Sequence, residues 1–265
     1  MIANAVLRFL VQKYPLRRGK HRLLTFAMER IRGVELGMDV AGNRLLLDLG
    51  DLIASFIFLQ GSYSLKTMTL LAHWAGKQGC RLFIDVGAHI GCFTLFFTRQ
   101  AVIEQIYAFE PNPRSFAQLQ VNLWLNRQFG KVKTYNMALS DRAGAARLDL
   151  SLTDRIGDYR KFNTGAARLD RMTQWSDDEG GICVQMQALD DLLEFRGQNI
   201  AVKIDVEGYE DHVLKGMERL LRFNNCVLLV ESSRPDSKNV DAWLRSLGYA
   251  VRENIGEDYL YLKCG

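Results

Sequence analysis

Acidic residues that could bind a ligand or accept a proton stand at the ends of apolar runs. Asp85 lies near the end of the run Leu82–Val86, and Glu110 follows the run Gln105–Phe109. Apolar runs of this length are typical of strands buried in a parallel sheet, and open sheets of this kind bind ligands at the carboxyl ends of their strands. We therefore expect the two acids to border one ligand-binding crevice.

A glycine turn, Gly87-Ala88-His89-Ile90-Gly91, follows Asp85 and leads into a helix that includes Phe93. Backbone N–H groups at such a helix start favour a nucleotide or nucleoside ligand. Hydroxyl or ammonium groups of that ligand could donate hydrogen bonds to Asp85. We expect Gly87 to let the ligand approach the backbone closely and Gly91 to let the helix pack on its strand. An ordinary strand-to-helix turn would show the same pattern.

Two further positions fit a nucleoside ligand. Glu110 lies about 20 residues beyond the glycine turn, the spacing at which an acid holds the ribose hydroxyls in nucleotide-binding α/β folds. The alternative is a carboxylate near the N-cap of the helix that Pro113 opens. Ser140 and Asp141 follow the next strand, where they could contact the base of the nucleoside, although a simple turn explains them equally well.

A group of charges occupies the strand expected over 200–206. Side chains alternate along a strand, so Lys203, Asp205 and Glu207 should share one side of it. Asp205 or Glu207 could accept a proton from a substrate, and Lys203 could neutralise the two acids. The alternative is a purely structural pair of a lysine with a carboxylate.

The same chemistry has other candidate residues. His89 and His212 are rival bases, but we expect His89 to act through its backbone in the turn and His212 to lie on a helix. Asp205, Glu207 and Glu231 lie at neighbouring strand ends and offer oxygen ligands that suit a hard cation. Nothing in their spacing requires a metal, and we expect none.

Strands and helices alternate along most of the chain, which predicts an α/β fold with a mostly parallel, Rossmann-like sheet and helices on both faces. Before the glycine turn we expect a hairpin over 33–60 that uses Leu45–Leu47 and Ile57–Leu59. The other predicted strands are 105–109, 132–137, 145–150, 182–188, 226–230, 248–251 and 259–262. The predicted helices are 65–75, 93–100, 115–126, 189–195, 211–221 and 240–247.

Composition excludes several classes of protein. Hydrophobic residues make up 48% of the 265 and charged residues 24%, which is typical of a globular protein rather than a disordered one. The net charge of +4 is too small to indicate nucleic-acid binding. The 5 scattered cysteines contain no C-x-x-C pair and fit reduced thiols better than disulfides or zinc ligands. We find no membrane-spanning run and a poor secretory signal, and expect a cytoplasmic protein.

The first 32 residues are strongly basic, with eight lysines and arginines against one acid, Glu29. Ile2, Val6, Phe9 and Leu10 fall at helical spacing and predict a short amphipathic helix. This helix could dock on the inner surface of a membrane or on an acidic glycan. We favour the alternative, in which the helix packs on the main domain and its basic face is solvated.

The motifs together resemble one family. Phe83-Ile84-Asp85-Val86-Gly87-Ala88-His89-Ile90-Gly91 and Val202-Lys203-Ile204-Asp205-Val206-Glu207-Gly208-Tyr209-Glu210 are similar to the two main motifs of the FkbM-type methyltransferases. Three shorter segments also resemble that family: Glu110-Pro111-Asn112, Ala138-Leu139-Ser140-Asp141 and Val213-Leu214-Lys215-Gly216. The resemblance extends from about residue 60 to about residue 231.

This resemblance implies a class I methyltransferase fold with an antiparallel last strand. It also implies S-adenosylmethionine as cofactor and O-methylation of a sugar, a glycan or glycolipid, or a secondary metabolite. By similarity, the methionine part would lie against the first motif, the ribose against Glu110 and the adenine against Ser140 or Asp141. The residues expected around the cofactor are Asp85, Gly87, Ala88, His89, Gly91, Phe93, Glu110, Pro111, Ser140, Asp141 and Asp205.

We expect residues 1–59 to form an N-terminal extension and residues 60–265 the methyltransferase domain. An inserted hairpin over about 145–189 would carry a substrate-facing tip near Asn163-Thr164-Gly165. A rival function is that of an NAD-dependent oxidoreductase, but Ala88-His89 stands where the G-x-G-x-x-G turn needs its second glycine. A non-catalytic glycan- or membrane-binding module would leave both acidic motifs unexplained.

Overall fold

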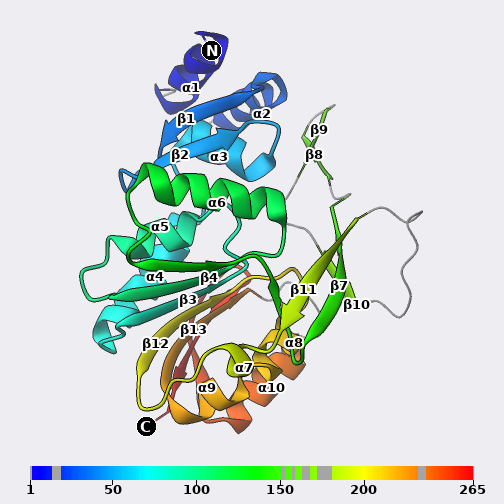
Figure 1. The fold of residues 1–265 in the computed structure, drawn as a ribbon. Helices are drawn as coiled ribbons and strands as arrows, with labels where there is room; N and C mark the ends of the chain where they lie inside the picture. Colours follow the sequence, from blue (N-terminus) through cyan, green and yellow to red (C-terminus); the bar gives the residue numbers. More distant parts are fainter. Residues whose placement is uncertain are drawn as a thin grey trace.

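The computed structural model describes residues 2–13, 19–150, 153–156, 159–162, 168–171, 181–231 and 237–264. Its centre is a seven-stranded sheet in the order β14-β15-β13-β12-β3-β4-β5 (Figure 1). These strands are β14 (Tyr249–Ile255), β15 (Asp258–Lys263), β13 (Asn225–Glu231), β12 (Asn199–Ile204), β3 (Leu82–Val86), β4 (Gln105–Phe109) and β5 (Val132–Tyr135).

The direction of the strands brings the acidic motifs to one edge of this sheet. The five strands from β5 to β13 pair in parallel, and β15 then pairs antiparallel with both β13 and β14. Val86 at the end of β3 lies opposite Ile204 of β12 and Phe109 of β4. The carboxyl ends of the three strands are therefore level, and the predicted antiparallel closing hairpin is confirmed.

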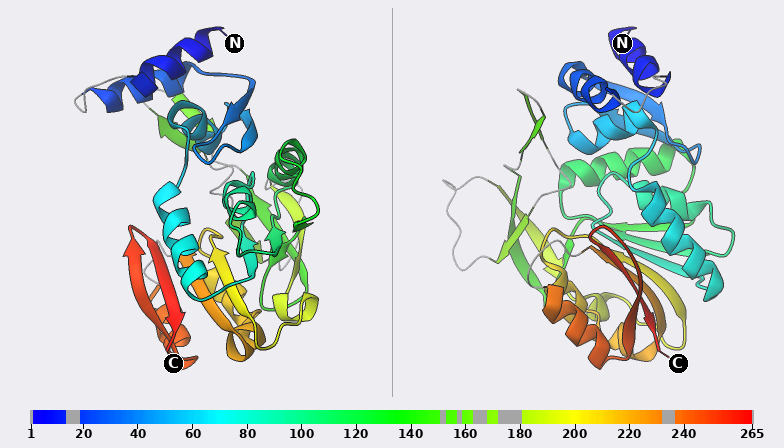
Figure 2. Two further views of the ribbon diagram at one scale, coloured as in Figure 1. Left: turned by 90° about the vertical axis from the view of Figure 1, so that its left-hand side faces the viewer. Right: turned by 180° about the vertical axis from the view of Figure 1, so that it is seen from behind.

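Helices cover both faces of the sheet (Figures 1 and 2). Residues of α4 (Leu65–Lys77), α5 (Cys92–Thr98) and α6 (Pro113–Leu125) form one apolar core with one face of the strands. The second core, on the other face, contains residues of α7 (Leu189–Leu192), α8 (Glu210–Lys215), α9 (Glu218–Phe223) and α10 (Ser237–Ser246). Because neighbouring residues of a buried strand such as Phe83 and Ile84 enter opposite cores, both kinds of position are apolar.

The N-terminal extension packs on α6. It consists of α1 (Ile2–Lys13), α2 (Lys20–Arg30), β1 (Val34–Met38), β2 (Arg44–Asp48) and α3 (Leu52–Gln60). The amide of Gln118 on α6 donates to the carbonyl oxygen of Leu46 at 2.6 Å, and the Leu46 N–H donates to Asn122 at 2.7 Å. Apolar residues of the extension also belong to the first core, so the extension is packed as part of the same body.

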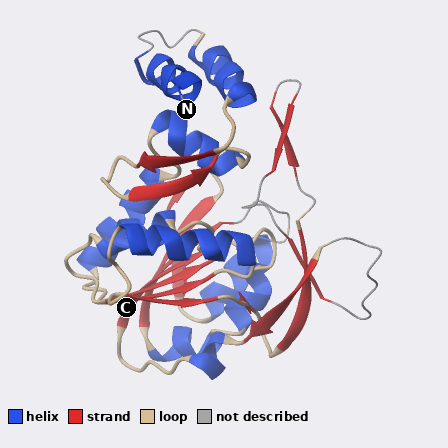
Figure 3. Ribbon diagram, turned by 45° about the horizontal axis from the view of Figure 1, so that its top comes forward, coloured by secondary structure: helices blue, strands red, loops and turns tan. Residues whose placement is uncertain are grey.

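A second sheet stands beside the main one, in the order β10-β7-β11-β6 (Figure 3). Its strands are β6 (Ala138–Leu139), β7 (Gly144–Asp149), β10 (Arg168–Arg171) and β11 (Ile182–Gln187), and a separate hairpin joins β8 (Thr153–Ile156) to β9 (Tyr159–Phe162). The predicted pair of strands is thus present as β7 and β11, which are antiparallel. The predicted tip at Asn163-Thr164-Gly165 lies outside the described residues.

Three expectations about local structure are wrong. Ile57–Leu59 belongs to helix α3, not to a hairpin, because Asp51 caps that helix by accepting from the Ala54 N–H. An apolar segment without a polar face can be a buried helix as well as a strand. The helix expected over 211–221 is two helices, α8 and α9, which are separated at Gly216 and Met217.

The third difference concerns the second motif. Strand β12 ends at Ile204, so Asp205 and Glu207 follow the strand rather than continue its alternation. The Asp205 N–H still donates to the carbonyl oxygen of Val86, but the chain then turns, with Glu207 at φ 53° and Gly208 at φ 92°. Among the helices of the described chain, none is long and apolar enough to cross a membrane.

Candidate active site

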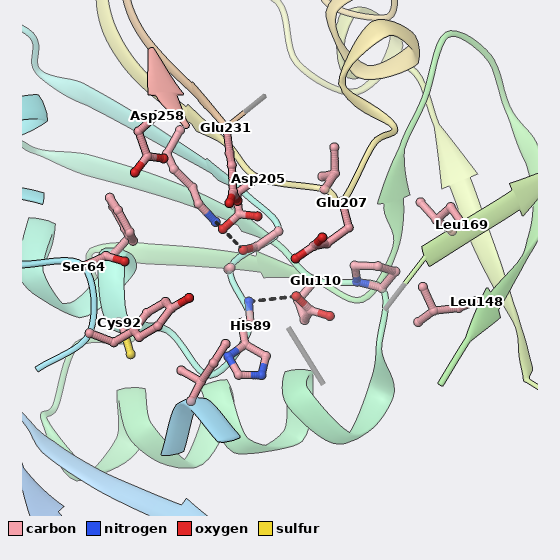
Figure 4. Close-up of a pocket in the computed structure, with 18 residues that line it drawn as sticks. Ser64, His89, Cys92, Glu110, Leu148, Leu169, Asp205, Glu207, Glu231 and Asp258 are labelled. Carbon is pink, nitrogen blue, oxygen red and sulfur yellow. Dashed lines mark hydrogen bonds and ion pairs between the residues drawn. The ribbon is translucent and has the colours of Figure 1, made fainter. Parts of the chain in front are cut away.

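A cavity opens at the carboxyl ends of β3, β4, β12 and β13, where four loops meet (Figure 4). From the main sheet come Gly87, Ala88, His89, Glu110, Pro111, Lys203, Asp205, Val206, Glu207, Glu231 and Asp258. The other lining residues are Ile53, Tyr63, Ser64, Cys92 and Phe93, with Leu148 and Leu169 from the second sheet. The cavity therefore contains residues of both main motifs.

The glycine turn is closed by its own hydrogen bonds. The N–H groups of Gly87 and Ala88 both donate to the carbonyl oxygen of Phe109 at 3.0 Å, and the Gly91 N–H donates to Ala88 at 2.9 Å. The His89 N–H donates to a carboxylate oxygen of Glu110 at 2.7 Å. These four N–H groups, which we expected to face a ligand, are used within the protein, so the turn is not a ready cradle for phosphate.

Both glycines have steric reasons within the protein, and the predicted approach of a ligand to Gly87 stays a prediction. Gly87 has a φ of 77°, and a Cβ atom there would overlap the carbonyl oxygen of Asp205. Gly91 has a φ of 92°, and its Cβ would stand 2.5 Å from a methyl carbon of Leu119 on α6. Gly87 thus allows the β3 turn to approach the loop after β12, and Gly91 allows α6 to pack, while both adopt a backbone conformation that favours glycine.

Glu110 is held beneath the turn by two backbone donors. Besides the His89 N–H, it accepts a hydrogen bond from the Asn112 N–H at 2.8 Å. Burial raises the pKa of Glu110 to about 7, although these two hydrogen bonds act in the opposite direction. Each carboxylate oxygen keeps a second lone pair, so Glu110 can still accept hydroxyl groups from a ligand in the cavity.

Lys203 stands between three oxygen-bearing groups. Its ammonium donates to the carbonyl oxygen of Gly87 at 2.6 Å and lies 3.2 Å from Asp205 and 3.7 Å from Asp85. Burial alone would lower the pKa of Lys203, but Asp205 and Asp85 together raise it, so the ammonium stays charged.

Asp85 lies behind Lys203 and does not line the cavity. It is fully buried, and one of its oxygens accepts from the Thr94 hydroxyl at 2.6 Å. The other oxygen has no hydrogen-bond partner among the described residues, and burial raises the pKa of the carboxyl. This orphaned oxygen depends on the Lys203 charge or on a donor supplied by a ligand.

Asp205, Glu207 and Glu231 form an acidic cluster at the carboxyl ends of β12 and β13. Each offers an oxygen, and these oxygens all lie within 4.8 Å of one another (Figure 4). A hydrogen bond from Glu231 to Asp205, together with burial, raises the pKa of Glu231 to about 9. Burial would raise the pKa of Asp205, but Lys203 lowers it. Asp205 is thus ionised and Glu231 holds a proton near neutral pH.

This cluster could also accept a divalent cation, because its donors are all carboxylate oxygens. The charge of Asp205 is, however, already balanced by Lys203 at 3.2 Å, and its repulsion from Glu231 is relieved by the proton on Glu231. The residues present therefore do not need a metal for their own stability, and our expectation of a metal-independent site stays a prediction.

The cavity as a whole is acidic. Five of its described lining residues carry a carboxyl group: Glu110, Asp205, Glu207, Glu231 and Asp258. Glu231 holds a proton near neutral pH, and Glu110, with a pKa of about 7, is partly protonated there. Against them stands Lys203, while burial lowers the pKa of His89 and keeps its imidazole neutral. The His89 ring also points away from the acidic cluster, and only its backbone faces Glu110 (Figure 4). The cavity is suited to a ligand that carries positive charge.

Four of the predicted cofactor residues do not line this cavity: Asp85, Gly91, Ser140 and Asp141. The Ser140 hydroxyl is buried and lies 3.2 Å from the hydroxyl of Tyr209. Asp141 lies 3.5 Å from His212, which is on a helix as predicted. Gly216 lies behind this loop, where a Cβ atom would overlap the carbonyl oxygen of Ser140. The predicted contact of Ser140 or Asp141 with a base stays a prediction.

Several lining residues escaped sequence reasoning. Tyr63 faces the cavity just before α4, and burial together with Asp205 raises its pKa to about 12. Asp258 begins β15 and accepts from the hydroxyl of Thr67 at 3.0 Å. No motif marks either residue. Glu231 could have been identified as a proton-holding group from its place at the end of an apolar strand, whereas we considered it only as a metal ligand.

Comparison with known proteins gives one family. The methyltransferase FkbM domain matches residues 85–251. The hexuronic acid methyltransferase AglP of Haloferax volcanii is 31% identical over 160 residues, which are 59% of this chain and 58% of that protein. The 31-O-demethyl-FK506 methyltransferase FkbM of Streptomyces tacrolimicus is 33% identical over 167 residues, which are 56% of this chain and 64% of that protein.

Among solved structures, the methyltransferase FkbM of Methylobacillus flagellatus KT aligns with a TM-score of 0.48 and 14% identity. That alignment covers 69% of this chain and 44% of the other. The chain thus spans about three fifths of the length of the two curated relatives, and less than half of this solved one.

Proposed function

The chain belongs to the FkbM methyltransferase family, and we propose that it is an S-adenosylmethionine-dependent O-methyltransferase. Its acceptor would be a hydroxyl group of a sugar, a glycan or glycolipid, or a secondary metabolite. The methyltransferase activity follows from the family. The cofactor and the acceptor class are the proposal, which the charge of the cavity supports.

The observation that carries the proposal is the set of five carboxyl groups around Lys203, of which Asp205 is ionised and Glu231 holds a proton. S-adenosylmethionine has a sulfonium and an ammonium group against a single carboxylate, so such a cavity attracts it. A nicotinamide dinucleotide has a doubly charged pyrophosphate, which the carboxylates would repel. The N–H groups of Gly87 and Ala88, which could have bound a pyrophosphate, already donate to Phe109.

The residues present also fit the separate parts of this cofactor. Glu110 has free lone pairs for the ribose hydroxyls, and the turn Gly87-Ala88-His89 lies beside it. Lys203 already occupies the carbonyl oxygen of Gly87 and shields Asp85. We therefore assign Asp85 an indirect role, in which it fixes Lys203 rather than binds the cofactor.

When bound, S-adenosylmethionine would supply an electrophilic methyl group, and the chain would supply position and a proton acceptor. An acceptor hydroxyl must lose its proton as the new bond forms. We assign this proton to Asp205, which is ionised because Lys203 lies 3.2 Å away. The proton on Glu231 would keep the negative charge of that group away from Asp205.

The apolar part of the cavity fits a role in acceptor binding. Leu148 of β7 and Leu169 of β10 line it from the second sheet, opposite the acidic cluster (Figure 4). Sugars and other hydroxylated metabolites present apolar faces beside their hydroxyl groups, so such a wall would orient one hydroxyl toward Asp205. The names of the two curated relatives, one a hexuronic acid methyltransferase, are compatible with a hydroxylated acceptor.

A transfer assay tests this proposal. The purified chain would be incubated with methyl-labelled S-adenosylmethionine and a panel of free sugars, lipid-linked glycans and hydroxylated secondary metabolites. We expect label to enter at least one hydroxyl-bearing acceptor in an alkali-stable ether linkage. Label found only on amine or carboxyl groups, which form N-methyl products or alkali-labile esters, would contradict O-methylation to an ether.

A further inference from the structure

Helix α1 presents its apolar side to solvent. The side chains that define this side are 84% exposed at Ile2, 51% at Val6, 61% at Phe9 and 45% at Leu10. A surface helix normally buries such a stripe against the protein. The sequence led us to favour a helix that packs on the main domain with a solvated basic face. Helix α1 does pack, through Leu7 and Val11, but the apolar stripe named above is exposed.

Contacts on the inner side explain why α1 lies in this way. Asn4 is buried and donates from its amide to the carbonyl oxygen of Arg32 and to the carboxylate of Glu35, both at 2.9 Å. The guanidinium of Arg8 lies over the ring of Phe58 at 5.1 Å, and Val11 is 1% exposed. The helix is therefore fixed by Asn4, Arg8 and Val11 together with the partly buried Leu7, and the four residues of the apolar stripe stay exposed.

The neighbouring strand β1 also exposes apolar side chains. Val34, Leu36 and Met38 are each more than half exposed, whereas the residues between them are partly covered. Because Asn4 contacts Arg32 and Glu35, the beginning of α1 adjoins the beginning of β1. Two elements of the extension thus leave apolar groups in water, which is more than the scattered exposure usual on a protein surface.

The segment that contains α1 and α2 has an excess of positive charge. Residues 1–32 contain eight lysines and arginines and a single acid, Glu29, and that acid pairs with Arg30 at 3.2 Å. In the described part of the segment, Lys13 at the end of α1 and Lys20 and Arg22 at the start of α2 are exposed. A second copy of this chain would bring the same positive charge to the contact. A surface of lipid phosphates would neutralise it.

We propose that the extension is a docking surface for an anionic phospholipid bilayer. Ile2, Val6, Phe9 and Leu10 would enter the boundary between the headgroups and the acyl chains, and Lys13, Lys20 and Arg22 would contact lipid phosphates. An interfacial helix binds in this way, by an apolar side in the membrane and basic residues at its border. The proposal does not depend on the cofactor or the acceptor, because it concerns only the extension.

Sedimentation with vesicles tests it. The full chain would be mixed with vesicles of phosphatidylcholine alone or of phosphatidylcholine with about one third phosphatidylglycerol, a composition in the range where basic segments bind. We expect binding to the anionic vesicles, at least tenfold weaker binding to the neutral ones, and a decrease with rising salt. The same binding to both kinds of vesicle, or none to either, would overturn the proposal.

Substitutions separate the apolar part from the charge. Phe9→Asp with Leu10→Asp should weaken binding to the anionic vesicles at least tenfold, and Lys13→Glu with Arg22→Glu should do the same. The control is Phe223→Asp on α9, which replaces another exposed aromatic residue, 49% exposed, on the far helical layer and should bind as the wild type does. All substituted positions are exposed, so their thermal unfolding midpoints should stay close to that of the wild type.

Two results would contradict the docking surface. If the Phe9→Asp, Leu10→Asp variant binds anionic vesicles as well as the wild type, the contact is a general attraction between charges and the apolar side takes no part. If the wild type is a dimer by light scattering and this variant is a monomer with unchanged vesicle binding, a second copy of the chain covers the apolar side.

Discussion

The ammonium of Lys203 donates a 2.6 Å hydrogen bond to the carbonyl oxygen of Gly87, and this bond links strand β12 to the turn after β3. Lys203 also lies between Asp85, which is fully buried, and Asp205, which faces the cavity. A single side chain therefore connects the two main motifs of the sequence. Changes at Lys203 should affect folding, the shape of the turn and the charge of the cluster together.

Lys203→Met should strongly destabilise the fold. It would leave Asp85 buried with no cation beside it, and breaking a buried pair in this way costs about 3 to 5 kcal/mol. The double variant with Asp85→Asn should recover a large part of that loss, because the buried charge is removed as well. Denaturant unfolding of the wild type, both single variants and the double variant measures this coupling. Strictly additive losses would mean that Lys203 and Asp85 do not interact.

Gly87→Ala should be more harmful than Gly91→Ala. At Gly87 the added methyl group would overlap a backbone oxygen, that of Asp205, whereas at Gly91 it would meet the flexible end of Leu119. Both changes also place alanine at a positive φ, which costs about 1 kcal/mol on its own. We expect a loss of roughly 1 to 3 kcal/mol for Gly91→Ala and little folded protein for Gly87→Ala. Equal unfolding midpoints of the two variants would be inconsistent with this packing.

Gly216→Ala separates the effect of steric overlap from the effect of a positive φ. Gly216 has a negative φ, so alanine is allowed there by conformation, but its Cβ atom would overlap the carbonyl oxygen of Ser140. We expect this variant to be destabilised by steric overlap alone. Gly130→Ala, at a position with no atom within 4 Å and no positive φ, should unfold like the wild type.

Glu110 should make the fold less stable as the pH rises. Its pKa is raised by burial from an ordinary 4.5 to about 7 in the folded chain, so the folded state binds this proton more tightly than the unfolded state does. The contribution of Glu110 to the free energy of unfolding is therefore fully present below about pH 4.5. It is lost progressively as the pH rises from about 4.5 to 7. The full change corresponds to about 3 kcal/mol.

The Glu110→Gln variant isolates this effect, because glutamine does not titrate. The difference in the free energy of unfolding between wild type and variant should shift by that amount across the same pH range, in the direction that favours the wild type at low pH. The constant loss of one backbone hydrogen bond in the variant does not alter the slope. Parallel curves from pH 4 to 8 would show that Glu110 does not have a raised pKa.

Asp205→Asn should reduce methyl transfer about 100-fold or more, since removal of a proton acceptor has an effect of that order. Glu207→Gln is the matched control, because Glu207 belongs to the same cluster but does not contact Lys203 in the ion pairs of the described chain. We expect the control to keep most of the activity. The turnover number of each variant at saturating acceptor gives the comparison, and the opposite ranking would assign the proton to Glu207.

The sequence predicts the parts of the site that depend on sheet topology. Asp85, Glu110 and Asp205 all follow or end apolar runs, and parallel strands bring such ends together whatever the loops do. For this reason the central sheet and its acidic edge were predictable, whereas the antiparallel last strand was expected from the family resemblance. Strand β4 was predicted with its observed bounds, 105–109.

The rest depends on contacts between distant segments, which local patterns do not encode. The need for glycine at 87 comes from Asp205 and the need at 216 comes from Ser140. Two N–H groups of the turn are engaged by the carbonyl oxygen of Phe109 and a third by the carboxylate of Glu110. Helix α3 is apolar on all sides, so the sequence around Ile57–Leu59 has no alternation of polar and apolar residues that would indicate a helix. The outward apolar side of α1 accompanies inward contacts of two polar residues, Asn4 and Arg8.

Titration calorimetry of the wild-type chain with S-adenosylmethionine tests the central claim most directly, with NAD⁺ and the variant Glu110→Ala as comparisons. We predict saturable binding of S-adenosylmethionine to one site per chain, at least tenfold weaker binding to Glu110→Ala, and no heat of binding with NAD⁺. Saturable binding of NAD⁺ without binding of S-adenosylmethionine would contradict the assignment of this cavity.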